Sequence, residues 1–177
     1  MSGGNAAANN YSTVKYENAE NGAITEVAAG AAIVSIAGNI AIGDNNIGAS
    51  VINNSIHQRH IARIAGVEIE AGRNVTVAAT DTTSILAIGV GVGVATGGFA
   101  GQAVVLNNRV DSAIYAEVGK AGRRTEIEAA DVVVYAQDAV IIRGSAHAGA
   151  LSAGGAASAA ISVNAIAMDI GTTVDNT

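Results

Sequence analysis

The 177-residue chain contains no cysteine, no proline and no tryptophan, and it has a single phenylalanine. The absence of cysteine excludes disulfides and thiolate metal ligands. Proline would remove a ladder hydrogen bond wherever it stood inside a sheet, so its absence fits a chain that lies mostly in strands. Because aromatic residues make up only 3% of the sequence, the core must be built from small and branched aliphatic side chains. Such a core suits thin, regular, stacked sheets.

Charge is also scarce in this chain. Charged residues make up 14% of it and the formal net charge is −6, which argues against nucleic acid or anionic lipid as a partner. The N-terminal segment is polar and lacks the basic and apolar regions of a signal peptide, so we expect Met1 to begin a piece of a longer chain. We predict a poorly ordered or capping segment over 1–22 and a repeat domain over 23–177.

Large and small residues alternate strictly from Ile85 to Thr96, which reads ILAIGVGVGVAT. This period of two predicts a strand, because a helix would lose about 0.8–1 kcal/mol at each interior glycine relative to alanine. We expect the strand to lie between two packed layers. One face is small and consists of Gly89, Gly91 and Gly93. The other is an aliphatic row for packing or assembly, made of Leu86, Ile88, Val90, Val92 and Val94.

An internal repeat accompanies this strand. The sequence VEIEA at 67–71 recurs as TEIEA at 125–129. Short strand patterns without helical periodicity separate the two copies, which favours a coiled parallel sheet over alternating strands and helices. We therefore predict an all-β fold, a parallel β-solenoid (β-helix) of about two to three units of roughly 58 residues. Because one solenoid turn needs roughly 20–30 residues, we expect two or three turns in each unit.

Asparagines follow each apolar stretch at corresponding places. They are Asn53 and Asn54, Asn107 and Asn108, and in a looser match Asn164. Asparagine tolerates left-handed backbone conformations, so we interpret these residues as corners of the solenoid. The alternative is a ladder in which each asparagine hydrogen-bonds its stacked neighbour.

The apolar stretches allow two further hypotheses. Ile85 to Leu106 contains 22 residues without a formal charge, enough for a membrane-spanning helix, and 27–42 and 144–168 are weaker candidates. Strands explain all three better, because the alternation wastes helix propensity and polar side chains dilute the outer two stretches. The glycines at 89–93 give GxGxG rather than GxGxxG and precede no helix pattern, so they do not predict a phosphate-binding loop.

Few residues suggest chemistry. His57 and His60 would lie on opposite faces of a strand, and we interpret their segment as an exposed polar loop rather than a metal site. Two pairs of carboxylates share a face of their strands and are interpreted as solvated rather than as an acid–base pair; they are Glu68 with Glu70 and Glu126 with Glu128. We predict no catalytic, cofactor-binding or metal-binding residue.

Basic residues gather on the polar segments between the apolar stretches. They are Arg59, Arg63, Arg73, Arg109, Lys120, Arg123 and Arg124. Stacked repeats could align them as a basic stripe, whereas the net negative charge favours a solvated face interleaved with glutamate.

The unit at 67–118, VEIEAGRNVTVAATDTTSILAIGVGVGVATGGFAGQAVVLNNRVDSAIYAEV, resembles the repeat regions of very large bacterial filamentous adhesins and leukotoxin-type exoproteins. The resemblance covers roughly Ala23 to the end of the chain and is carried by composition and period. It implies a β-helical passenger that is exported by a two-partner or autotransporter route. It carries over no functional residue.

The strand and repeat patterns predict a non-enzymatic structural module that forms a rod or fibre. The resemblance implies that this module is extracellular, lies at the bacterial cell surface and has an adhesive role. The alternative is a self-polymerising subunit of an extracellular filament. A carbohydrate-active β-helix enzyme and a small membrane protein rank below both. Expected partners are further copies, joined through strand edges or apolar sheet faces, and a host surface protein or glycan.

Overall fold

A computed structural model describes residues 2–4, 8–19, 22–120 and 122–175. Every element in these ranges is a strand, which confirms the all-β prediction for the described residues. The strands are β1 (Ser2–Gly4), β2 (Ala8–Ala19), β3 (Gly22–Gly43), β4 (Asn46–Ile64), β5 (Glu68–Glu70), β6 (Val75–Ala95), β7 (Phe99–Val118), β8 (Glu126–Glu128), β9 (Val132–Ser152) and β10 (Gly155–Val174).

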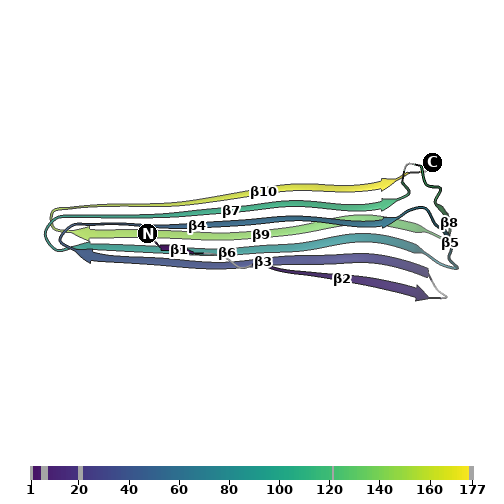
Figure 1. Cartoon of the computed structure of the whole chain (residues 1–177), viewed down its shortest axis with the longest axis horizontal. Coiled ribbons are helices and arrows are strands. Elements are labelled where there is room, and N and C mark those ends of the chain that lie inside the picture. Colours follow the sequence, from purple (N-terminus) through teal and green to yellow (C-terminus); the bar gives the residue numbers. More distant parts are fainter. Residues whose placement is uncertain (1, 5–7, 20–21, 121, 176–177) are drawn as a thin grey trace.

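Two long four-stranded sheets form the molecule (Figure 1). The β3 sheet has the order β2-β3-β6-β9, and the β4 sheet has the order β1-β4-β7-β10. Six strands have 19 to 22 residues, so each is about 65 Å long. The molecule is therefore elongated along its strands.

The chain passes alternately between the two sheets. A tight turn after β3, β6 and β9 leads into the next strand of the β4 sheet, and all three turns lie at one end of the molecule (Figure 1). The chain then returns at the opposite end through segments that hold β5 and β8, which pair with each other. All pairs between long strands are parallel.

The strand register gives the length of chain between equivalent strands of neighbouring repeats. Ile24 of β3 pairs with Thr76 of β6, and Val75 of β6 pairs with Val132 of β9. Each repeat thus contributes one strand to each sheet. The prediction of two or three turns in each unit is wrong, because β6 alone has 21 residues and β7 has 20 residues. One passage through both sheets therefore consumes the whole repeat.

The core lies between the sheets as two separate apolar clusters. The cluster nearer the tight turns contains Ile33, Ile52, Ile85, Leu106 and Val110 with smaller residues around them. The other contains Ile64, Val75, Val77, Ile114 and Val118. Alternate residues of each strand point inward to these clusters, as the period of a strand requires.

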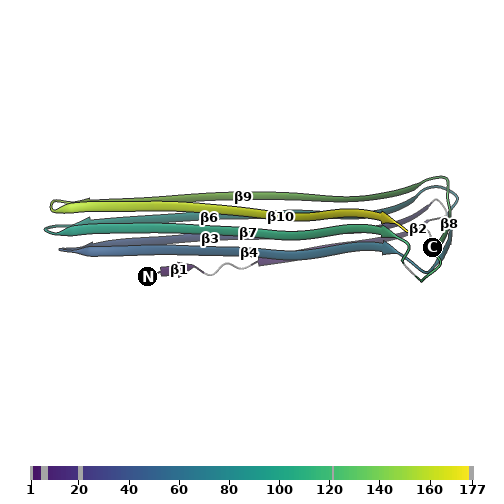
Figure 2. The ribbon, with the colours of Figure 1, turned by 90° about the horizontal axis from the view of Figure 1, so that it is seen from above.

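The N-terminal segment supplies two strands at one edge of the stack. β2 pairs antiparallel with β3, and β1 pairs with residues 50–52 of β4 (Figure 2). Of the segment for which we predict a poorly ordered or capping role, residues 1, 5–7, 20 and 21 lie outside the described residues. The strands β9 and β10 form the other edge.

The three apolar stretches weighed as membrane helices lie in strands and, for the two longer ones, in the turns that join them. Within the ranges that the structure describes, no helix is long and apolar enough to cross a membrane.

Candidate functional site

The glycine row of β6 faces the opposite sheet. Gly89, Gly91 and Gly93 are buried between the layers. A Cβ atom added at Gly89 would lie 2.6 Å from Cγ1 of Val104, and one added at Gly91 would lie 2.9 Å from Cγ2 of the same residue. These separations are shorter than real Cβ contacts. The two sheets can approach this closely only because the row has no side chains.

The aliphatic row of β6 points away from the core. Leu86, Val90 and Val92 keep 39–42% of their surface exposed. The prediction that β6 is covered on both faces is therefore wrong for the single chain. The two rows differ because the opposite sheet covers only the inner face of β6, and the described residues provide no third layer outside it.

The neighbouring strand β3 extends this outer surface. Ile40 pairs with Val92 and Ile42 pairs with Val94, and both isoleucines are more than 70% exposed. We call the combined surface the aliphatic face; it consists of Val34, Ile36, Ile40 and Ile42 of β3 and Leu86, Ile88, Val90, Val92 and Val94 of β6. Contiguous exposed apolar surface of this kind is typical of interaction sites.

Three asparagines form a hydrogen-bonded ladder, in which Asn54 and Asn108 are buried between the sheets and Asn164, on the edge strand β10, is exposed. Nδ2 of Asn54 donates to Oδ1 of Asn108 at 2.7 Å, and Nδ2 of Asn108 donates to Oδ1 of Asn164 at 2.8 Å. At the start of the ladder, Oγ of Ser35 donates to Oδ1 of Asn54 at 2.6 Å. The alternative interpretation of these asparagines, as a ladder between stacked neighbours, is confirmed.

The interpretation of the asparagines as corners is wrong. Asn53 and Asn54 lie inside β4, and Asn107 and Asn108 lie inside β7. Stacked amides satisfy each other between the sheets, so asparagine is stable there without a turn. The actual turns between the sheets are residues 44–45, 96–98 and 153–154.

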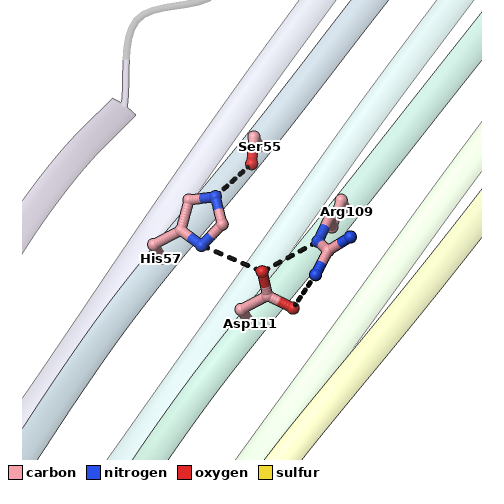
Figure 3. Close-up of polar contacts among 4 residues, drawn as sticks. All are labelled: Ser55, His57, Arg109 and Asp111. Carbon is pink, nitrogen blue, oxygen red and sulfur yellow. Dashed lines mark hydrogen bonds and ion pairs between the residues drawn. The ribbon is translucent and has the colours of Figure 1, made fainter.

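The outer face of the β4 sheet carries a cluster of four polar side chains (Figure 3). Oγ of Ser55 lies 2.8 Å from Nε2 of His57, and Nδ1 of His57 lies 2.9 Å from Oδ2 of Asp111. Arg109 holds the same carboxylate through two bonds, from Nε at 2.8 Å and from Nη2 at 3.0 Å. Ser55 and His57 belong to β4, whereas Arg109 and Asp111 belong to β7.

Charge pairing favours the ionised forms of Asp111 and Arg109 in this cluster. The hydrogen bonds from Arg109 lower the pKa of the Asp111 carboxyl, and the charges of Arg109 and His57 lower it further. In turn, the hydrogen bond to Asp111 raises the pKa of Arg109. The carboxylate is therefore ionised and can orient the His57 ring.

The order serine, histidine, aspartate matches that of a nucleophile with its base and orienting acid. Acyl transfer also needs donors aimed at the developing oxyanion, and backbone N–H groups of a sheet lie in its plane rather than above its face. Moreover, Ser145 and His147 of β9 make the same contact at 2.7 Å. Serine and histidine two residues apart on one strand therefore meet because of strand geometry alone. We interpret the cluster as a polar network on the surface of the sheet.

An open hollow of about 450 Å³ lies beside this cluster. Its lining includes His57, Arg59, Asp111, Met168 and Asp169. Our sequence-based interpretation missed the contact between His57 and Asp111. The offset between Asn53 and Asn107, applied to His57, would have placed it beside Asp111.

The other residues singled out from the sequence are spread over the molecule. His57 points outward and His60 points inward, so the prediction that they occupy opposite faces is confirmed. The interpretation of their segment as a loop is wrong, because both lie in β4, where pairing with β7 satisfies the backbone. The carboxylate pairs lie exposed on β5 and β8, and Glu68 is in register with Glu126.

Several of the basic residues pair with acids instead of forming a basic stripe. Arg63 contacts Glu117 on the neighbouring strand, and Nη2 of Arg124 lies 2.7 Å from Oε2 of Glu126. Arg109 is held by Asp111 as described above. Water and salt screen exposed pairs of this kind, so they contribute little to stability. They make the face a mixed-charge surface.

No protein-family model, curated protein or solved structure matches this chain. Within the described part of the chain, no three histidine, cysteine or acidic side chains are arranged to hold a metal ion.

Proposed function

We propose that the chain is a non-enzymatic structural module, a segment of parallel β-solenoid that forms a rod at the bacterial cell surface and presents it for adhesion. One observation carries the proposal: equivalent strands stack in register, as β3, β6 and β9 in one sheet and as β4, β7 and β10 in the other. Each repeat therefore lengthens the stack by about 4.8 Å without changing its cross-section.

Free strand edges provide a means of lengthening the rod. Among the residues described, no strand pairs with the outer edge of β9 or of β10. The N–H and C=O groups of such an edge are a template for another strand. A further repeat could thus extend both sheets at once.

Two further considerations support the proposal. The resemblance of the repeat at 67–118 to filamentous adhesins and leukotoxin-type exoproteins supports the extracellular location and the adhesive role. The backbone N–H groups beside Ser55, His57 and Asp111 lie in the plane of the sheet and do not form an oxyanion hole above it, which supports a non-enzymatic role.

Electron microscopy of the purified chain tests the rod directly. We expect rods or filaments whose width matches a strand length of about 65 Å. The same preparation should show the diffraction of parallel strands spaced about 4.8 Å along the rod axis. Monodisperse particles that do not elongate at any concentration would contradict the proposal.

A second candidate function is a filament subunit that associates through the aliphatic face. The specific observation in its favour is the exposure of 63–75% at Val34, Ile36, Ile40 and Ile42. These residues lie beyond the part of β3 that pairs with β2, and they continue the exposed row of β6. A second copy of the chain offers the same flat apolar surface, and two such faces can pack as sheets do, about 10 Å apart.

Lysine substitutions on the aliphatic face test this association. The double variant Ile40→Lys with Val92→Lys should weaken self-association by at least about tenfold, because burial of each aliphatic side chain contributes about 1.5–3 kcal/mol and a buried ammonium opposes contact. Analytical ultracentrifugation measures the change. Thr82→Lys, on the exposed outer side of the same β6 strand, is the control and should leave association unchanged. Equal effects of both variants would contradict a specific role of this face.

A further inference from the structure

A polar cluster separates the two apolar clusters of the core. Its centre is a pair of aspartates, Asp81 of β6 and Asp138 of β9, which are paired in register on adjacent strands. Asp81 is 3% exposed and Asp138 is half-buried. Both carboxyl groups lie on the inner side of their sheet, since they alternate with outward residues such as Thr82 and Ala139.

The hydrogen bonds in this cluster satisfy only one carboxylate oxygen. Oγ1 of Thr83 donates to Oδ2 of Asp81 at 2.7 Å, and Nε2 of Gln58 donates to the same oxygen. Oδ1 of Asp81 and both carboxylate oxygens of Asp138 are buried without a hydrogen-bond partner. Three acceptors without donors inside a protein are unfavourable, and they are more so if both groups are charged.

One basic side chain faces the pair from the opposite sheet. Nε2 of His60, on β4, lies 3.7 Å from Oδ1 of Asp81. Among the residues that the structure describes, the other long strands bring no ionisable group at the equivalent positions. β7 has Ser112 and Ile114, β10 has Met168 and Ile170, and β3 has Ala29 in register with Asp81. A single histidine beyond hydrogen-bond distance does not balance two adjacent carboxylates.

A proton shared between the two aspartates supplies the missing hydrogen-bond donor and removes one of the two adjacent negative charges. A protonated carboxyl is a donor, so one orphan oxygen gives a hydrogen bond to another and the pair carries one charge instead of two. We propose that Asp81 and Asp138 hold one shared proton inside the core, which fastens β9 to β6, and that its release at higher pH loosens the last repeat from the stack.

The local electrostatics also favour a protonated carboxyl at Asp81. Burial raises the pKa of Asp81, and the neighbouring Asp138 raises it further, whereas the Thr83 hydrogen bond and His60 oppose the change. In the unfolded chain the carboxyl has its ordinary pKa of 3.8. The folded state therefore binds more protons, so the stability from this pair is complete below about pH 4 and is lost as pH rises through the raised value.

Replacing one member of the pair by its amide tests the proposal. The variant Asp138→Asn supplies an N–H donor to Asp81 at every pH, so it has no shared proton to lose. We expect the melting temperature of the parent chain to fall between pH 5 and pH 9 by about 2–4 °C more than that of the variant. Infrared spectroscopy should detect a protonated carboxyl in the parent at neutral pH and not in the variant.

Two controls separate this effect from general titration. Asp81→Asn should flatten the pH dependence in the same way and serves if Asp138→Asn does not fold. Asp111→Asn removes a surface carboxyl whose pKa is lowered, so its loss should destabilise most at neutral pH. Hydrogen exchange in the parent chain needs no variant. The protection of the β9 amides relative to their intrinsic exchange rate should fall as pH rises, whereas that of β6 should fall less.

Two results would overturn the shared proton. One is a parent chain whose stability and β9 exchange have the same pH dependence as those of both amide variants. The other is a rise in melting temperature when Ca²⁺ or Na⁺ is added, lost in Asp138→Asn, because both carboxylates would then be ionised around a bound cation.

Discussion

Replacing Gly89 by valine is expected to lower the free energy of unfolding by about 2–3 kcal/mol or more, because it adds bulk where the sheets are in contact. The first added atom would lie 2.6 Å from Cγ1 of Val104 and 3.0 Å from Cδ2 of Leu106. Both neighbours are fully buried on the central strand β7, so neither can move aside without displacing others. Denaturant unfolding monitored by circular dichroism measures the change.

A glycine on the outer side of the sheet is the matched control. Gly149 of β9 pairs with Val92, and a Cβ atom there would meet nothing within 4 Å. Gly149→Val should leave stability unchanged or raise it by up to about 1 kcal/mol, since valine favours strands. If Gly89→Val were as well tolerated as Gly149→Val, the sheets would have to be farther apart at β6 than the structure has them.

Truncation of the central asparagine should have an effect of similar size. Asn108 is fully buried, accepts from Asn54 and donates to Asn164. In Asn108→Ala both bonds are lost and the buried amide of Asn54 has no acceptor, so we expect a loss of about 2–4 kcal/mol. Thermal unfolding at fixed pH measures it.

The adjacent residue is the control for Asn108. Asn107 points to the outer side of the same strand and is exposed, so Asn107→Ala should change stability by no more than about 0.5 kcal/mol. Equal losses from the two variants would mean that the strand itself, and not the ladder, depends on asparagine.

Strand content and the repeat were predictable from the sequence because both follow from local patterns. The alternation from Ile85 to Thr96 identifies β6, and the recurrence of VEIEA as TEIEA gives the register of β5 with β8. Such patterns are local, because alternate residues of every strand point to opposite faces of its sheet.

Strand length and the position of the turns were not predictable in the same way. Asparagine pairs are turn signals in most sequences, and here they lie inside β4 and β7 because stacking supplies their partners. The true turn at 96–98 contains two glycines but follows a run of glycines that lies within a strand. Local composition cannot distinguish these cases, since the partner that decides them belongs to the neighbouring repeat.

The polar cluster of the core illustrates the same limit. Ala79-Thr80-Asp81 and Ala136-Gln137-Asp138 share the pattern alanine, any residue, aspartate, and alignment of the two repeats on this pattern would have stacked the two aspartates. Burial of their carboxyls could not be inferred, because it depends on the β4 sheet that covers them.

The length of the strands also has a mechanical consequence. A repeat of about 57 residues occupies one strand spacing along the stack, about 4.8 Å, whereas the same residues pulled straight span about 190 Å. Under tension, detachment of β9 and β10 would first have to break two ladders, which run along strands of 21 and 20 residues. Once they yield, the released length is about forty times the thickness lost. A tether built from such repeats would therefore absorb a sudden pull by releasing chain while the remaining repeats stay folded.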